Sequence, residues 1–217
     1  MESHLINIQA RIASRVVLED QYSVEFVAGV DQAFKNELVI SGAVVLDSSL
    51  KVRDLASCIL ETSFPYIPGF LSFREGPSAI RAIKALRPKP TLLFVDGCGI
   101  NHPRKAGLAS HIGVILGTPT VGISKNVLCG SFEIPTKVGQ SSSLIMGSEE
   151  VGHMLKTCEG CRPIVISPGH LISVDSSLEV VRRFLRSSKL PEPCRLAHEY
   201  ARRVKGTLPV PMQAAFP

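Results

Sequence analysis

The stretch Thr91-Leu92-Leu93-Phe94-Val95-Asp96-Gly97-Cys98-Gly99 decides the fold class. The four residues before Asp96 are all apolar, which is typical of a strand that is buried on both faces. Asp96-Gly97 is also a frequent two-residue hairpin turn, but the residues that follow, up to Pro103, do not alternate as a returning strand would. A glycine loop and then a helical pattern come next, so the stretch begins an α/β unit. In such units functional groups gather at the carboxyl ends of the strands.

An antiparallel meander is indicated on the N-terminal side of this unit. The runs Val24–Ala33, Glu37–Leu46 and Val52–Thr62 are read as strands, because they are rich in apolar residues and are joined by short connections. Before them, a period of three to four residues between Leu5 and Val16 predicts an amphipathic helix. After them, Phe64–Gly69 contains two prolines and a glycine and is expected to be a loop.

Helix and strand patterns alternate on the C-terminal side. Helical periods cover Ser78–Leu86, His102–Leu116 after its first residues, Ser176–Arg186 and Pro193–Val204. Strand-like runs cover Thr120–Ser124, Ser142–Met146 and Pro163–Ser167. The full order predicts an α/β fold with one mixed sheet, made of the antiparallel three-strand meander plus parallel strands and flanked by helices. We expect a single domain over residues 1–205. Residues 206–217 hold one glycine and three prolines, and we expect a flexible C-terminal tail there.

The composition is that of an ordinary globular protein with a basic charge balance. Of the 217 residues, 45% are hydrophobic and 20% charged, which suits one domain with a full core. A net charge of +5 is compatible with a polyanionic partner such as nucleic acid but is weak support alone. No apolar run approaches the roughly 18 residues of a membrane span, and residues 1–4 do not begin a secretory signal. We therefore expect no membrane association and a cytoplasmic location, or a nuclear one in a eukaryote.

Six cysteines occur in the chain, and we expect reduced thiols, because the chain is long and lacks a secretory signal. Cys158 and Cys161 form one Cys-x-x-Cys pair. A structural zinc site needs four ligands, and no second pair at ligand spacing follows. A surface turn with two thiols is the better interpretation of this pair.

Three acidic residues stand in contexts that suggest a function. Asp31 ends the apolar run Val27-Ala28-Gly29-Val30. A carboxylate in a central strand is costly unless it is paired or bound to a metal ion, whereas in an edge strand it would face water. Asp96 ends the buried strand described above. Glu75 either caps a helix through the pattern Ser72-x-x-Glu75 or stands ahead of a helix whose first turn holds Pro77.

Carboxylates that converge from separate elements can hold Mg²⁺, a cation that prefers oxygen ligands. Metal ions held in this way promote phosphodiester hydrolysis by activating water and stabilising the leaving oxygen. The acidic residues alone therefore suggest metal-dependent phosphoryl transfer and name no substrate.

Several basic residues allow two interpretations each. Lys125 follows an apolar strand, where it can reach past the strand end to water or place a cation beside a phosphate group. His170 follows a strand and Pro168-Gly169, and it is either an exposed loop residue or a site residue. For His111 we favour packing. Arg182, Arg183 and Arg186 are read as a solvated helix face.

Blocks of sequence around these residues resemble the endonuclease V family. The match covers about residues 5–205 and runs through Gly29–Phe34, Phe64–Glu75, Phe94–Gly99, His102–His111, Val121–Lys125 and Ser167–His170. The Pro65–Glu75 block and the Asp96–Arg104 block are specific, and finding both in this order leaves little room for chance. Departures are modest, since Gln32 and Cys98 occupy variable positions and neither replaces a carboxylate. The resemblance implies a ribonuclease H-like fold.

The resemblance also implies roles for individual residues. Asp31, Glu75 and Asp96 fall on the catalytic metal-binding acids, and Lys125 and His170 on further catalytic residues. The implied cofactor is Mg²⁺, for which Mn²⁺ can substitute.

A second part of the resemblance concerns the base. The loop Pro65, Tyr66, Ile67 and Pro68 falls on a wedge that pries the damaged base from its stack, and Gly69, Leu71 and Gly97 would surround the extruded base. The alternative for Tyr66 is packing into the core beneath the loop. We expect His102, Arg104 and Lys105 to contact the nucleic-acid backbone.

The implied activity is that of a DNA-repair endonuclease, which we expect to be a monomer. It recognises deoxyinosine, whose base is hypoxanthine, and hydrolyses the second phosphodiester bond on the 3′ side, leaving 3′-hydroxyl and 5′-phosphate ends. An inosine-specific ribonuclease is the first alternative, since members of the family differ in preferring DNA or RNA. A non-catalytic binding module is disfavoured because all three carboxylates are present, and a junction resolvase because of the wedge block.

Overall fold

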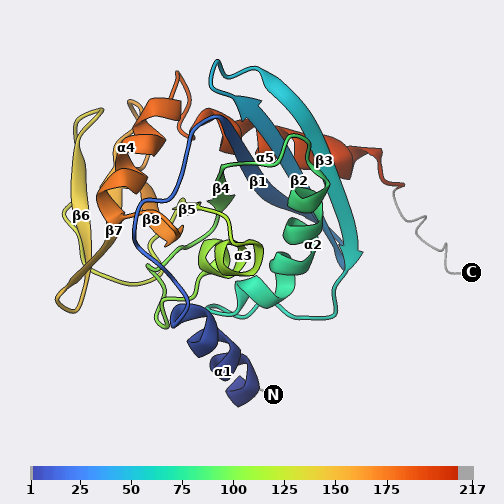
Figure 1. The fold of residues 1–217 in the computed structure, drawn as a ribbon, viewed down its shortest axis with the longest axis horizontal. Coiled ribbons are helices and arrows are strands. Elements are labelled where there is room, and N and C mark those ends of the chain that lie inside the picture. Colours follow the sequence, from blue (N-terminus) through green and yellow to red (C-terminus); the bar gives the residue numbers. More distant parts are fainter. Residues whose placement is uncertain (1, 210–217) are drawn as a thin grey trace, which may run out of the picture.

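The computed structural model describes residues 2–209 (Figure 1). Most of the predicted tail, residues 206–217, lies outside this range. Its first two residues, Gly206 and Thr207, still belong to the last helix.

A mixed sheet forms the centre of the described part of the chain, with eight strands in the order β3-β2-β1-β4-β5-β8-β7-β6. The strands are β1 (Phe26–Lys35), β2 (Leu38–Asp47), β3 (Val52–Glu61), β4 (Leu92–Asp96), β5 (Thr120–Ser124), β6 (Ser141–Met146), β7 (Glu149–Leu155) and β8 (Ile164–His170). The antiparallel pairing of β1 with β2 and of β2 with β3 confirms the predicted meander. β4 and β5 run parallel to β1, and β8, β7 and β6 continue the sheet antiparallel.

Helices cover both faces of this sheet (Figure 1). Within residues 2–209 they are α1 (Glu2–Ala13), α2 (Leu71–Ala85), α3 (Leu108–Leu116), α4 (Val174–Phe184) and α5 (Glu192–Thr207). α2 and α3 pack on the face that includes Ala28 and Leu93, whereas α4 and the start of α5 pack on the face that includes Val27 and Phe94. Residues 27–30 of β1 and 92–95 of β4 are apolar at every position, because both faces of the sheet are buried there. No helix in this range is both long and apolar enough to cross a membrane.

α5 lies unusually close to the sheet because two strand positions carry no side chain. A Cβ atom at Gly29 of β1 would come within 2.0 Å of the Pro193 carbonyl oxygen, and one at Gly42 of β2 within 2.7 Å of the Ala201 nitrogen. The backbone of α5 therefore rests directly on β1 and β2. This contact determines which side chains of α5 reach the end of β1.

α2 begins at Leu71, seven residues before the predicted start, so both interpretations of Glu75 are wrong. The residue before the helix is Phe70, no side chain caps the first turn, and Glu75 lies within the helix. Pro77 is also inside the helix, where its missing N–H removes one backbone hydrogen bond. The buried face formed by Ala79 and its neighbours on the sheet outweighs that loss, since most helix stability in proteins comes from packing.

The prediction of free thiols is wrong for one pair. Cys158 and Cys161 form a disulfide in the loop between β7 and β8. The turn brings their Cα atoms to 5.4 Å, within the range that a disulfide spans. The other four cysteines are free, as expected.

Candidate active site

Asp31 and Asp96 are brought together by the two central parallel strands. β1 and β4 pair in parallel up to Val30 and Val95, so the next residue of each strand stands side by side at the carboxyl ends. Since side chains alternate along a strand, both carboxylates lie on the same face of the sheet as Val27 and Phe94, the face that α4 and α5 cover. β1 has neighbours on both sides, so the edge-strand alternative for Asp31 is wrong. β4 leads through α3 into the parallel strand β5, so the hairpin alternative for Asp96 is wrong as well.

Lys125 adds a positive charge to this edge of the sheet. It directly follows β5, and its Nζ donates to Oδ2 of Asp96 across 3.1 Å. Burial acts to lower the pKa of Lys125, but the charge of Asp96, its hydrogen bond and the charge of Asp31 outweigh burial and raise this pKa. The side chain is 44% exposed, so a charged amine faces the cavity that the acids line.

His198 of α5 completes this group, although no sequence pattern pointed to it. Its Nδ1 lies 2.6 Å from Oδ2 of Asp31. A carboxylate oxygen accepts and a ring N–H donates, so Nδ1 is the donor of this hydrogen bond and Nε2 points away from Asp31. The side chain is 39% exposed and lines the same cavity.

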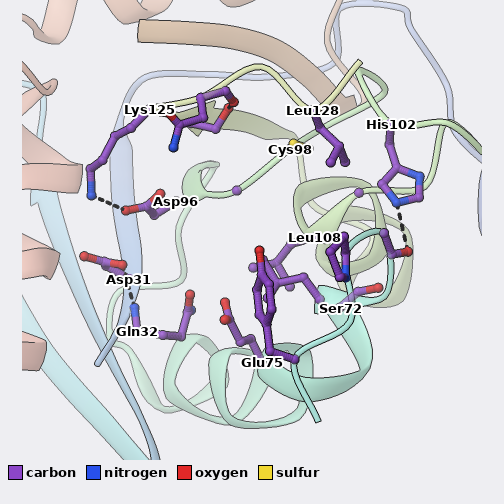
Figure 2. A pocket seen from close by; sticks show the side chains of 18 of the residues that line it. Asp31, Gln32, Ser72, Glu75, Asp96, Cys98, His102, Leu108, Lys125 and Leu128 are labelled. Atoms are coloured by element: carbon purple, nitrogen blue, oxygen red, sulfur yellow. Dashed lines mark hydrogen bonds and ion pairs between the residues drawn. The ribbon is translucent and has the colours of Figure 1, made fainter. Parts of the chain in front are cut away.

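Glu75 reaches the cavity from the opposite layer, because α2 covers the other face of the sheet. Figure 2 shows Asp31, Asp96 and Glu75 around one open space. Burial, together with the charges of Asp96 and Asp31, raises the pKa of Glu75 to about 8. Burial and the charge of Asp31 likewise raise the pKa of Asp96 to about 6, although Lys125 acts in the other direction. The three carboxylates thus repel one another, and added positive charge would stabilise them.

The donor set consists of carboxylate oxygens, which suit a hard cation that keeps some of its waters, and does not form a closed protein cage. Within residues 2–209, no group of three or more His, Cys, Asp or Glu side chains is arranged so that the group could hold a metal ion. Mg²⁺ keeps several of its waters and usually takes only one or two carboxylates as direct ligands. Asp31 and Asp96 stand side by side, and Glu75 faces them, which suits such an ion.

One cavity of about 400 Å³ joins these acids to the loop before α2. Gly69, Leu71 and Gly97, the three residues expected around a base, all line it. Tyr66, Ile67 and Pro68 line it as well, and Pro65 precedes them in the same loop. Tyr66 is 69% exposed, so the alternative that it packs into the core is wrong.

The sequence matches the family profile described as Endonuclease V over residues 10–199. The chain belongs to the endonuclease V family. The endonuclease V of Archaeoglobus fulgidus is 46% identical over 94% of this chain and 93% of that protein, and that of Methanopyrus kandleri is 42% identical over 93% and 88%. Members of this family are nucleases.

Solved structures of the family share the fold. The endonuclease V structure from Streptomyces avermitilis is 36% identical, with a TM-score of 0.88 over 95% of this chain and 93% of that one. The structure from Bacillus subtilis is 30% identical, with a TM-score of 0.89 over 95% and 92%. The predicted ribonuclease H-like mixed sheet flanked by helices is confirmed.

The structure does not bring His170 to the site to which the endonuclease V resemblance had assigned it. His170 ends β8 and pairs with Thr120, the first residue of β5, whereas Lys125 follows the last. Because β8 is antiparallel to β5, the carboxyl end of β8 lies beside the amino end of β5, whereas the acids lie at the carboxyl ends of β1 and β4. There Nδ1 of His170 accepts a hydrogen bond from the Val17 backbone N–H at 3.2 Å. His198 occupies the place beside the acids that was predicted for His170.

Two of the three residues expected to contact the nucleic-acid backbone bind the main chain of the loop before α2. His102 and Arg104 both bond the Gly69 carbonyl oxygen, through Nε2 at 3.0 Å and Nη2 at 2.9 Å. His102 is only 3% exposed, so its ring cannot reach a phosphate at the surface. Lys105 is 42% exposed and pairs with Glu149. His111 is buried and packs edge-on against Phe73, as expected.

Proposed function

We propose that this protein is a metal-dependent endonuclease that recognises inosine in a nucleic-acid strand and hydrolyses a phosphodiester bond near it. The observation that carries the proposal is that one cavity joins three carboxylates to an exposed aromatic loop. A nuclease that inspects a base needs both parts at a fixed separation, because the base and the cleaved bond belong to one strand. Deoxyinosine in DNA is the proposed substrate, and repair of deaminated DNA the proposed role.

Asp31, Glu75 and Asp96 would hold the metal ion, in part through its bound waters, and for this ion we propose Mg²⁺ with Mn²⁺ as a substitute. Oxygen ligands suit such a hard cation, and the raised pKa values of Glu75 and Asp96 indicate a local excess of negative charge. When bound, the ion activates water and stabilises the leaving oxygen.

Lys125 and His198 would act directly on the phosphate group. Asp96 holds the Lys125 amine at the cavity, where a fixed cation stabilises negative charge that develops on the phosphate oxygens. Asp31 holds the His198 ring through Nδ1. An imidazole oriented in this way can take up or release a proton at Nε2, which is the role of a general acid or base.

The loop Pro65–Pro68 would separate the base from its stack, and Gly69, Leu71 and Gly97 would surround and recognise it. A base must leave the stack before a pocket can inspect it, and the exposed ring of Tyr66 can fill the gap that remains. Hypoxanthine carries an acceptor at O6 and a donor at N1, the reverse of adenine, so main-chain N–H and C=O groups can distinguish the two. Gly69 and Gly97 have φ angles of +81° and +155°, a backbone form that favours glycine and lets the main chain approach the base closely.

Cleavage would be displaced from the inspected base. The acids and the base loop line different parts of the same cavity, so a base held beside Gly69 leaves a phosphate farther along the strand beside Asp96. We propose the second phosphodiester bond on the 3′ side, with 3′-hydroxyl and 5′-phosphate products.

A cleavage assay on end-labelled strands tests this proposal. The strands carry one deoxyinosine, or deoxyadenosine at the same position, or riboinosine in RNA. A fourth probe follows the endonuclease V of Ciona intestinalis, a fold relative at 22% identity and TM-score 0.75, which was solved with DNA containing an inosine followed by a ribo-adenosine. We expect one Mg²⁺-dependent nick in the deoxyinosine strand and none in its control. Release of a free base would contradict the proposal, and cleavage of the riboinosine strand alone would favour the inosine-specific ribonuclease.

A further inference from the structure

Helix α1 is tied to the base loop through one buried side chain, Gln9. Its Nε2 donates to the Gly69 carbonyl oxygen at 2.7 Å, although the two residues are 60 positions apart in the sequence. Gln9 is completely buried, in a helix whose other positions are mostly exposed. A buried amide is costly unless it is hydrogen-bonded, so this contact is a specific part of how α1 docks.

The Gly69 carbonyl is the meeting point of three donors. Gln9 supplies one, and His102 and Arg104 supply the others at 3.0 and 2.9 Å. Arg104 also donates through Nε to Oε1 of Gln9, and its guanidinium lies 4.6 Å from the ring centroid of Phe70. The amide of Gln9 therefore uses both its donor and its acceptor in one network around a single carbonyl group.

This carbonyl belongs to the residue that joins the wedge loop to α2. Gly69 has a positive φ of +81°, lines the cavity, and is followed by Phe70 and the first residue of α2. A rotation of its peptide plane would move Pro68 and Tyr66 on one side and the Leu71 backbone on the other. Three donors oppose that rotation, because turning the carbonyl away would take this acceptor from the buried Gln9 and His102 and from the half-buried Arg104.

We propose that Gln9 is a positioning residue for base recognition, which holds the Gly69 peptide in the orientation that the base pocket requires. The proposal rests on the proposed function, since it assigns the network to inosine recognition. α1 thereby acts beyond its packing contacts with Ala106 and Val114, which are made by Ile12. Gln9 touches neither the carboxylates nor Lys125, so it acts on the selection of the base and not on the hydrolysis itself.

Gln9→Met tests the network at nearly constant side-chain volume. We expect the preference of kcat/KM for the deoxyinosine strand over its deoxyadenosine control to fall by about tenfold, the usual effect of one lost hydrogen bond to a group that must be held. The fall should appear in KM, and kcat at saturating substrate should stay near the wild-type value. Gln9→Glu keeps the acceptor for Arg104 and loses the donor to Gly69, so the same loss of preference is expected.

Ile12→Ala is the matched control on the same helix. It weakens the apolar contact of α1 and leaves the Gly69 network intact, so its melting temperature should fall at least as much as that of Gln9→Met while the inosine preference stays unchanged. Equal loss of preference in Ile12→Ala and Gln9→Met would overturn the proposal, because α1 would then act only by its attachment. Full preference in Gln9→Met or in Gln9→Glu would overturn it as well. A wild-type enzyme without inosine preference would instead refute the proposed function.

Discussion

Replacing Tyr66 by alanine tests the wedge, and the structure separates its effect on binding from its effect on stability. The ring is 69% exposed, so its removal should change the free energy of unfolding by no more than about 0.5 kcal/mol, as for other surface substitutions. Stacking of an aromatic side chain on a base contributes roughly 1–3 kcal/mol. That range corresponds to about 5- to 150-fold weaker binding of an inosine-containing duplex.

The assay measures binding of duplexes with and without one deoxyinosine, together with the melting temperature of the protein. Tyr66→Phe keeps the ring and should retain most of the affinity. Ile115→Ala serves as a control, because Ile115 is also exposed but lies near the end of α3, at the edge of the sheet opposite the acids. The reasoning is refuted if Tyr66→Ala lowers the melting temperature strongly and leaves the relative preference for inosine unchanged.

The acids and the two histidines can be tested separately. Asp96→Asn removes a carboxylate beside the proposed metal ion, so single-turnover cleavage should fall by at least about a hundredfold while inosine binding persists; a parallel loss of binding would contradict this. The raised pKa of Glu75, about 8, means that the metal-free folded protein binds a proton that the unfolded chain releases near its usual value. Stability in the presence of a chelator should therefore fall as the pH rises from about 5 and level off above about 8, where the folded protein has also lost this proton. Mg²⁺ should raise the melting temperature more at about pH 8 than at about pH 6; a larger Mg²⁺ effect at the lower pH would contradict this. His198→Ala should lower kcat by about 10²- to 10⁴-fold with little change in KM, as for a lost general acid or base. His170→Ala should leave kcat unaltered. If His170→Ala lowered kcat more than His198→Ala did, His170 would be the site histidine and this assignment would be wrong.

Much of the fold follows from local patterns. β5 occupies the predicted residues, and the three meander strands agree to within two residues at each end, because apolar runs between turn residues mark buried strands clearly. β7 has no such mark, since it begins with Glu149 and Glu150 and contains Gly152. The early start of α2 was missed because Pro77 is a local signal for a helix start, whereas the packing of α2 on the sheet is not visible locally.

The two histidines show what local reasoning cannot supply. The family resemblance assigns His170 to the site, and its place after a strand agrees with that assignment. The carboxyl end of a strand lies beside the acids only where the strand is parallel to β4, and the direction of β8 is a property of the whole sheet. His198 lies in a helix with no motif around it. Its position depends on the contact between Gly29 and Pro193, residues that are far apart in the sequence and meet only because glycine leaves room.

The site combines both layers of the molecule, and this explains its electrostatics. Asp31 and Asp96 belong to the sheet face beneath α5, whereas Glu75 is carried by α2 on the other face. The carboxylates meet only when both layers dock on the sheet, and burial then raises the pKa of Glu75 and Asp96 in a way that opposes folding at neutral pH. Lys125 offsets part of this cost at Asp96, and His198 donates a hydrogen bond to Asp31 on the same side of the cavity. Neither of these two residues stabilises the charged form of Glu75. A cation that reached Glu75 would therefore stabilise the docking of α2 against the sheet as well as promote the proposed reaction.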